Sequence, residues 1–286
     1  MIDLHIHTTH SSDGQYRPEE IFAMAASEGV KAFSFTDHMD VGAAAQGVNL
    51  APRYDIEFFT GLEISTSLEE REHHLLCYAF NPDSTFIDEF LRYHCCRIWE
   101  QAHVLLDYFH SLGFDVSKED VTGWGESVPT GVTFLDAIKK RNSQDPRLHE
   151  YLLGNKSHSP YLNFYQDFSL TQFGGIISST LPSLHQCIYE FKDMGILILA
   201  HPGNIGKDVL LELKECGLAG IEVYSSHHTP AITNHLSSLA ASLDLYASAG
   251  SDFHGERIKP DIVFGDLPGQ PEAALMQVLR RGRRLS

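Results

Sequence analysis

Short apolar segments alternate with amphipathic ones along much of the chain. Residues 2–7 alternate apolar and polar positions, and further strand-like segments lie at 32–38, 58–65, 72–80, 195–203, 220–226 and 245–254. Helical patterns separate several of them, as at 18–28, 207–216 and 230–243. Strands that alternate with helices form a parallel sheet, and seven such strands indicate a barrel. The pattern therefore predicts an α/β fold with a TIM-like (β/α)7 barrel.

The middle of the chain departs from this alternation. It contains a long amphipathic helical pattern at about 86–111, a second near 131–141, and then the polar and aromatic stretch NKSHSPYLNFYQDF. We expect a barrel built from residues 1–85 and 191–286, with a mostly helical insertion at 86–190 over the barrel mouth. No apolar run approaches the roughly 20 residues that span a bilayer, so no membrane association is expected.

Side chains that bind metals recur at the predicted strand ends. They are His5, His7, His38, Glu63, His74, His201, Asp252 and His254. The loops at the carboxyl ends of barrel strands converge, and α/β barrels build their active sites there. Because His5 and His7 are two residues apart on one strand, both rings point to the same side and can share an ion. Imidazole and carboxylate ligands without thiolates suit Zn, Mn or Fe, so the pattern predicts a cluster of divalent transition-metal ions.

The net charge and the cysteine content limit the expected partners and the expected cellular location. The 38 acidic residues outnumber the 21 basic ones, which gives a formal net charge of −17 and disfavours nucleic acid as a partner. An anionic small substrate stays compatible, since bound cations would reverse the field locally. The five cysteines form no CxxC pair, and the first residues lack the basic and apolar regions of a signal peptide. Both features indicate a cytoplasmic location.

Six segments, DLHIHTTHSSDG, FTDH, GLEIS, HLLCY, LAHPG and AGSDFHG, occur in this order along the chain. Together they closely resemble the motifs of the PHP (polymerase and histidinol phosphatase) superfamily, and they are most similar to those of its small stand-alone metal-dependent phosphoesterases. The resemblance covers about residues 1–80 and 195–260. It implies a distorted seven-stranded barrel, the PHP fold, that carries a trinuclear metal centre.

The resemblance also implies a ligand set, motif by motif. The first ion would be held by His5, His7, Glu63 and Asp252; Glu63 would bridge to a second, completed by His74 and His201; and Asp13, His38 and His254 would hold the third. Two of these positions have rivals. His73 competes with His74, and only one of them can face inward because neighbours in a strand point to opposite sides. His10 competes with Asp13.

The same resemblance points to residues near the substrate. In GIEVYSSHHTP it selects His228, with His227 as the rival, as the catalytic residue that protonates the leaving oxygen or contacts phosphate. The Gly-Arg-Pro-His-like segment of many relatives is missing from the insertion. Lys156 and His158 are its candidate replacements, and Arg53 is a further candidate for substrate binding.

These observations predict a phosphatase that uses two to three divalent ions (Mn, Zn or Fe) and a metal-activated hydroxide. Three clustered cations match the dianion of a small phosphomonoester, such as a nucleotide, a sugar phosphate or an amino-alcohol phosphate. The alternatives are a histidinol phosphatase, an exonuclease or phosphodiesterase, an amidohydrolase-like hydrolase, and a non-catalytic metal-binding module. A nuclease would favour a basic groove, and an amidohydrolase a lysine at a strand end; the sequence indicates neither. It leaves the oligomeric state open.

Overall fold

The computed structural model describes residues 1–69, 71–121, 128–170 and 180–282. Seven strands form one sheet whose spatial order follows the chain. They are β1 (Ile2–Ile6), β2 (Ala32–Phe35), β3 (Glu57–Leu68), β4 (Arg71–Tyr78), β5 (Ile196–Leu199), β6 (Gly220–Ser225) and β7 (Tyr246–Gly250). The chain joins the two edges just beyond β1 and β7, where the His7 N–H donates to the Phe253 carbonyl over 2.9 Å. The sheet is therefore a nearly closed barrel, as expected.

One strand runs against the others, which corrects the expectation of a wholly parallel sheet. β1, β2 and β3 are parallel, and so are β5, β6 and β7, but β4 is antiparallel to both β3 and β5. The cause is the length of the connection. Only residues 69 and 70 separate β3 from β4, which suffices for a hairpin, whereas a parallel neighbour requires a crossover of a dozen residues or more.

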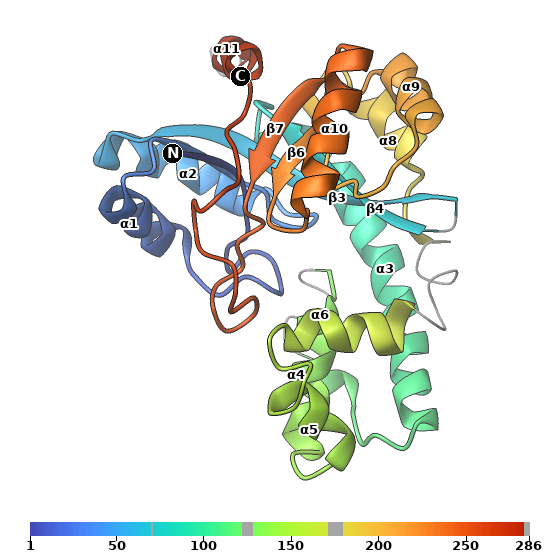
Figure 1. The fold of residues 1–286 in the computed structure, drawn as a ribbon. Coiled ribbons are helices and arrows are strands. Elements are labelled where there is room, and N and C mark those ends of the chain that lie inside the picture. The colour runs from blue at the N-terminus through green and yellow to red at the C-terminus, as the bar shows by residue number, and fades with distance from the viewer. Residues whose placement is uncertain (70, 122–127, 171–179, 283–286) are drawn as a thin grey trace.

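Helices cover the outside of the barrel (Figure 1). They are α1 (Pro18–Glu28), α2 (Gly42–Tyr54), α3 (Thr85–Ser111), α8 (Leu184–Phe191), α9 (Lys207–Cys216), α10 (Pro230–Leu243) and α11 (Ala273–Gly282). Local sequence explains their ends: Pro18 opens α1 and Gly29, at φ 71°, closes it. The segment that follows His38 forms α2. No helix among the described residues is long and apolar enough to cross a bilayer.

The long helix α3 belongs to two hydrophobic cores. Its first half packs on the barrel through Ile87 and Leu91. Its second half, including Leu105 and Phe109, joins a separate core with the short helices of the middle segment. Those are η1 (Lys118–Asp120), α4 (Gly131–Arg141), α5 (Pro146–Leu152), α6 (Pro160–Tyr165) and the π-helical turn η2 (Gln166–Leu170).

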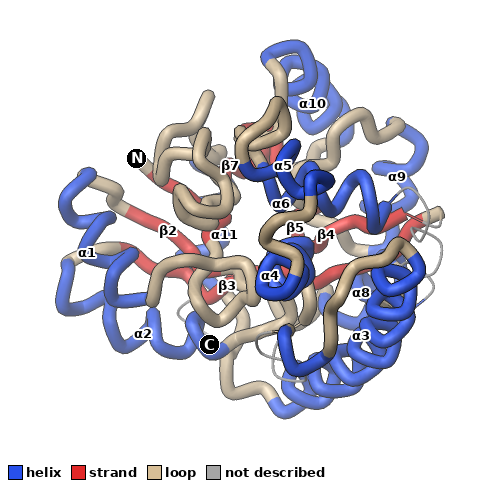
Figure 2. The backbone as a smooth tube through the Cα atoms, turned by 90° about the horizontal axis from the view of Figure 1, so that it is seen from below, coloured by secondary structure: helices blue, strands red, loops and turns tan. Residues whose placement is uncertain are grey.

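This second core holds α4, α5 and α6 together at the far end of α3, apart from the main body of the barrel (Figure 1). The view from below shows α4 and α6 in front of the strands (Figure 2). Helix α8, in contrast, packs against β3, β4 and α9. The middle segment is therefore mostly helical, and its second core faces one end of the barrel.

Candidate metal centre

Strand β1 and the residue just after it supply two histidines to one side of the sheet, because alternate residues of an extended chain share a face. His5 and His7 are fully buried, and their Nε2 atoms lie 3.2 Å apart. The opposite ring nitrogens are engaged elsewhere: His5 Nδ1 lies 3.0 Å from Glu222 Oε1, and His7 Nδ1 lies 3.1 Å from Ser11 Oγ. Because an ionised carboxylate can only accept, His5 Nδ1 carries a proton and donates it to Glu222, which leaves Nε2 directed at the centre.

Glu63 occupies the middle of the cluster. Its Oε2 lies 3.2 Å from His5 Nε2, 3.1 Å from His7 Nε2 and 3.1 Å from His38 Nδ1. Its Oε1 lies 2.9 Å from His74 Nδ1 and 3.5 Å from His201 Nε2. One carboxylate thus faces five imidazoles from four different segments, and it is fully buried.

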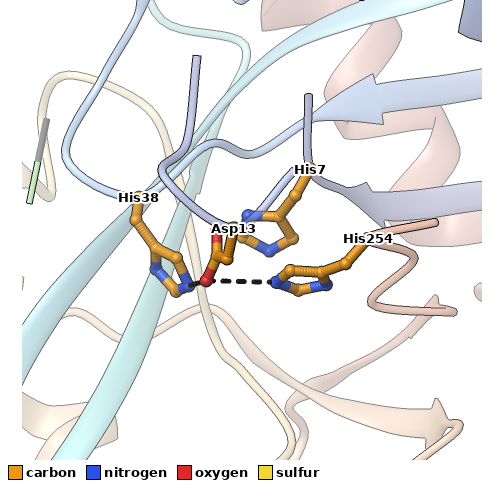
Figure 3. Close-up of side chains that lie close together, drawn as sticks. All are labelled: His7, Asp13, His38 and His254. Atoms are coloured by element: carbon orange, nitrogen blue, oxygen red, sulfur yellow. Dashed lines mark ion pairs between the residues drawn. The ribbon is translucent and has the colours of Figure 1, made fainter. Parts of the chain in front are cut away.

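Asp13 gathers a second group of rings, shown in Figure 3. Its Oδ2 lies 3.5 Å from His38 Nε2 and 3.5 Å from His254 Nε2. The ring of His7 stacks on that of His254, with centroids 4.0 Å apart. The donor atoms of His7, Asp13, His38 and His254 all lie within 4.8 Å of one another.

The donor atoms fit divalent metal ions. Several buried polar atoms of the cluster have no hydrogen-bond partner, although other polar atoms are close: Asp13 Oδ1, His38 Nδ1, His74 Nδ1 and both carboxylate oxygens of Glu63. Unsatisfied buried polar groups are rare in proteins, and a missing ion is one standard cause. Two further groupings, His5–His7–Glu63–Asp252 and His38–Glu63–His74, have donor atoms within 4.8 Å of one another. This geometry, with oxygen and imidazole donors, suits transition metals.

The structure brings all nine expected ligands together. His74 faces inward from β4, and it does so from the first half of that strand because β4 runs antiparallel. Asp13 is inside the cluster, whereas His10 lies at the rim, 3.1 Å from Asp40. His201 and Asp252 follow β5 and β7 with positive φ angles of 25° and 55°. Such backbone conformations are uncommon outside glycine and concentrate at functional sites.

The histidines of the cluster differ in pKa. Burial is the largest influence on His7 and disfavours its charged form, but the carboxylates of Asp252 and Glu63 outweigh it and raise the pKa to about 9. Burial also disfavours the charged form of His74, but the carboxylates around it, chiefly that of Glu63, outweigh burial and raise the pKa to about 10. Burial lowers the pKa of His38 to about 3. The cluster therefore holds protons at neutral pH that an entering cation would displace.

Sequence reasoning missed two residues that contact the cluster. Glu222 on β6 is fully buried between His5 and the loop after β5, whose His201 N–H donates to Glu222 Oε2 over 2.9 Å. The sequence signal for Glu222 is a charged residue within an otherwise apolar strand. Lys259 follows β7, and its Nζ donates to Asp252 Oδ2. No motif marks it, and only the path of that loop brings it to the site.

The expected substrate residues lie elsewhere. The loop after β6 turns the His228 ring onto the backbone, where Nδ1 lies 3.0 Å from the Val223 carbonyl and Nε2 accepts from Gly203 N–H. Its neighbour His227 faces the cluster instead, with Nε2 2.5 Å from Asp252 Oδ2. This placement corrects the choice of His228 over His227.

The three other candidate substrate residues also lie away from the metal ligands, each for a separate reason. Arg53 is exposed on the last turn of α2, since the segment after His38 is helical and carries it away. Lys156 pairs with Asp167 within the insertion, and His158 contacts Asn155. The described residues that line the site include none of the three.

A cavity of about 230 Å³ opens over the cluster. Asp13, His38, His74, His201, Asp252 and His254 line its floor. Residues of α3, α4 and α6 line the opposite wall. The site therefore lies in a partly open cavity between the barrel and the helical segment, which reduces its contact with water.

Replacing Glu222 by glutamine should weaken metal binding by about 10–100-fold, the usual effect of losing a residue that orients a ligand. Both oxygens of Glu222 accept hydrogen bonds, from His5 and from the His201 backbone. An amide offers one acceptor, so one donor loses its partner. Metal affinity measured by competition with a chelator tests this. Glu212→Gln, an exposed change on α9, is the control, and equal affinities in both variants would contradict the orienting role.

Comparison with known proteins supports one family. Residues 3–119 match the PHP domain model. A phosphoribosyl 1,2-cyclic phosphate 1,2-diphosphodiesterase of Eggerthella lenta is 27% identical, over 89% of this chain and 94% of that protein. A 3′,5′-nucleoside bisphosphate phosphatase of Chromobacterium violaceum is 24% identical, over 88% and 87%. A 5′-3′ exoribonuclease of Haemophilus influenzae is 25% identical, over 88% and 89%.

Solved structures agree on the fold. A protein of Bifidobacterium adolescentis, assigned to the metal-dependent phosphoesterases, superposes with a TM-score of 0.81 at 20% identity, over 98% of this chain and 96% of that one. The likeness extends over the barrel and the helical segment together. The PHP domain match at residues 3–119 and this shared fold show that the chain resembles PHP proteins.

Proposed function

We propose that this protein is a metal-dependent phosphoesterase that hydrolyses small phosphomonoesters. The observation that carries the proposal is Glu63, a buried carboxylate among five imidazoles, three of which (His38, His74 and His201) line a cavity. Divalent ions bound by such groups polarise a phosphoryl oxygen and lower the pKa of water. The named activities of all three relatives concern phosphate esters.

The chain's own residues prepare the site for a phosphoryl group. Glu222 and Ser11 hold the rings of His5 and His7 in fixed orientations. Lys259 adds a positive charge beside Asp252, at the edge of the floor. Fixed charges and dipoles of this kind stabilise the charge that develops during phosphoryl transfer, because they need not reorganise.

The shape and charge of the site favour a small substrate over a polymer. The wall formed by α3, α4 and α6 stands across from the metal ligands, and the net charge of −17 opposes the approach of a polyanion. An exoribonuclease is among the relatives, so nucleic acid is the second candidate substrate.

A panel of substrates on metal-reconstituted protein tests the proposal. It compares small phosphomonoesters, phosphodiesters and 5′-phosphorylated oligonucleotides after loading with Mn, Zn or Fe. We expect the highest kcat/KM for a small monoester. Efficient degradation of oligonucleotides, with all small monoesters left intact, would instead assign the protein as a nuclease.

The two adjacent histidines after β6 should differ in effect. His227 lines the cavity, and burial together with the charge of Lys259 lowers its pKa to about 4, so the ring is neutral at pH 7 and able to contact phosphate or the leaving oxygen. We expect His227→Asn to lower kcat/KM by about 100-fold, within the range for a group that acts on the reacting atoms. The matched change His228→Asn should cost far less. Steady-state kinetics at saturating metal measures both, and the reverse order would return the role to His228.

A further inference from the structure

The cavity over the metal ligands has two unlike sides. Its floor consists of the histidine and carboxylate ligands, and its opposite wall is mostly apolar, with Gln101, Thr130 and Tyr161 among the apolar side chains. The apolar wall is formed by Ile98, Leu105, Val132, Phe134, Leu162, Leu181 and Ile258. Most of these side chains are buried in the two cores, and Leu162 on α6 is half-buried. A substrate whose phosphoryl group reaches the floor therefore places its other end against hydrocarbon.

Positive charge is confined to the floor. Among the described residues that line the cavity, Lys259 is the one cationic side chain, and it is bound to Asp252. Arg257 does not line the cavity; it donates to the hydroxyl of Tyr161 in the wall over 2.6 Å and pairs with Asp136 over 3.0 Å, so its charge is already neutralised. The segments 122–127 and 171–179, outside the described residues, contain no lysine or arginine. A second phosphate at the apolar end would be desolvated without a counter-charge, which is strongly unfavourable.

The volume of the cavity also limits the size of the substrate. An apolar cavity of about 150 Å³ admits benzene. The cavity of about 230 Å³ has room for one phosphoryl group and one ring, or a short branched chain.

We infer that the substrate is a phosphomonoester with one phosphate and an uncharged, apolar leaving group. The inference rests on the proposed function, because it assumes that the phosphoryl end lies at the metal ligands. It also separates this protein from the Chromobacterium relative, whose name specifies two phosphates on one nucleoside.

The test compares substrates whose leaving alcohols have similar basicity, so that binding and not intrinsic reactivity decides. Benzyl phosphate carries a ring, glycerol phosphate carries hydroxyls, and adenosine 3′,5′-bisphosphate carries a second phosphate. We expect kcat/KM for benzyl phosphate to exceed that of each of the others by about 10–100-fold, as burial of a ring predicts. Equal or lower values for benzyl phosphate would overturn the inference.

A substitution in the wall sharpens the test. Leu162→Arg places a cation beside the apolar end, and it should lower the ratio of benzyl phosphate to glycerol phosphate kcat/KM by about 10-fold. It should also raise the relative rate with the bisphosphate. Leu153→Arg is the matched control, since Leu153 is 77% exposed at the end of α5 and does not line the cavity. Unchanged ratios in a folded Leu162→Arg protein would contradict the role of the wall.

A binding measurement separates failure of the inference from failure of the proposed function. Benzylphosphonate and methylphosphonate are not hydrolysed, and they differ only in the ring. Calorimetric titration of the metal-loaded protein should show benzylphosphonate binding about 10-fold more tightly or better. A protein that hydrolyses no monoester would contradict the proposed function. Equal affinities for the two phosphonates would overturn the inference, whatever the activity.

Discussion

Glu63→Gln is expected to lower kcat/KM for phosphomonoester hydrolysis by about 1,000-fold, equivalent to several kcal/mol of lost stabilisation of the transition state. The carboxylate lies within 3.5 Å of nitrogen atoms of five histidines. Glutamine removes the negative charge and presents an amide N–H₂ group to one side of the cluster, where it cannot bind a cation. Kinetics and elemental analysis of the same preparations measure the effect.

Two comparisons make this result specific. Glu57→Gln changes the first residue of the same strand, where Glu57 pairs with Arg280 at the surface, and it should alter activity by less than about 2-fold. His254→Asn should cost less than Glu63→Gln, because His254 takes part in the Asp13 group alone. Equal losses in Glu63→Gln and His254→Asn, with both proteins still loaded with metal, would contradict the central position of Glu63.

Removal of metal is expected to abolish activity and to lower the melting temperature by about 5–10 °C. Gently purified protein should contain two to three ions per chain by elemental analysis. A ligand at 1,000 times its Kd stabilises a protein by about 4 kcal/mol, and for a chain of this size each kcal/mol shifts Tm by about 2 °C or more. Dialysis against a chelator, followed by thermal unfolding and activity assays, measures both effects.

Reconstitution supplies the control for this experiment. Adding Mn, Zn or Fe back should restore activity and Tm together, since the same ions serve both. Protein that contains less than one ion per chain, or that keeps its activity after chelation, would contradict the metal-centre proposal.

Much of the fold and of the predicted ligand set was accessible from sequence because it depends on local periodicity. Seven strand patterns predicted the seven strands, and the spacing of His5 and His7 placed both rings on one face. Helices α9 and α10 have the predicted bounds of 207–216 and 230–243. The predicted strand ends indicated His38 and His201, whereas Asp13 lies in a loop and was selected by the motif resemblance alone. The structure then shows these segments meeting at one site.

The direction of β4 was decided by the tertiary structure. Its alternating pattern reads the same in either orientation, and the two-residue connection to β3 makes it antiparallel. Reversal brings the first half of β4 to the barrel mouth, so His74 reaches Glu63 from within a strand and not from its end.

The surroundings of the metal ligands also required the fold. His227 and His228 are neighbours in a turn, where no periodicity tells which ring points inward; hydrogen bonds to the backbone of Val223 and Gly203 decide it. Glu222 and Lys259 carry no motif of their own. Glu222 gains its role from a contact with His5, 217 positions away in the chain, and Lys259 reaches Asp252 through the path of the loop after β7. The apolar wall likewise comes from separate segments of the helical insertion. Local sequence specified strands, helices and ligand types, whereas contacts between distant segments determined which side chains surround the substrate.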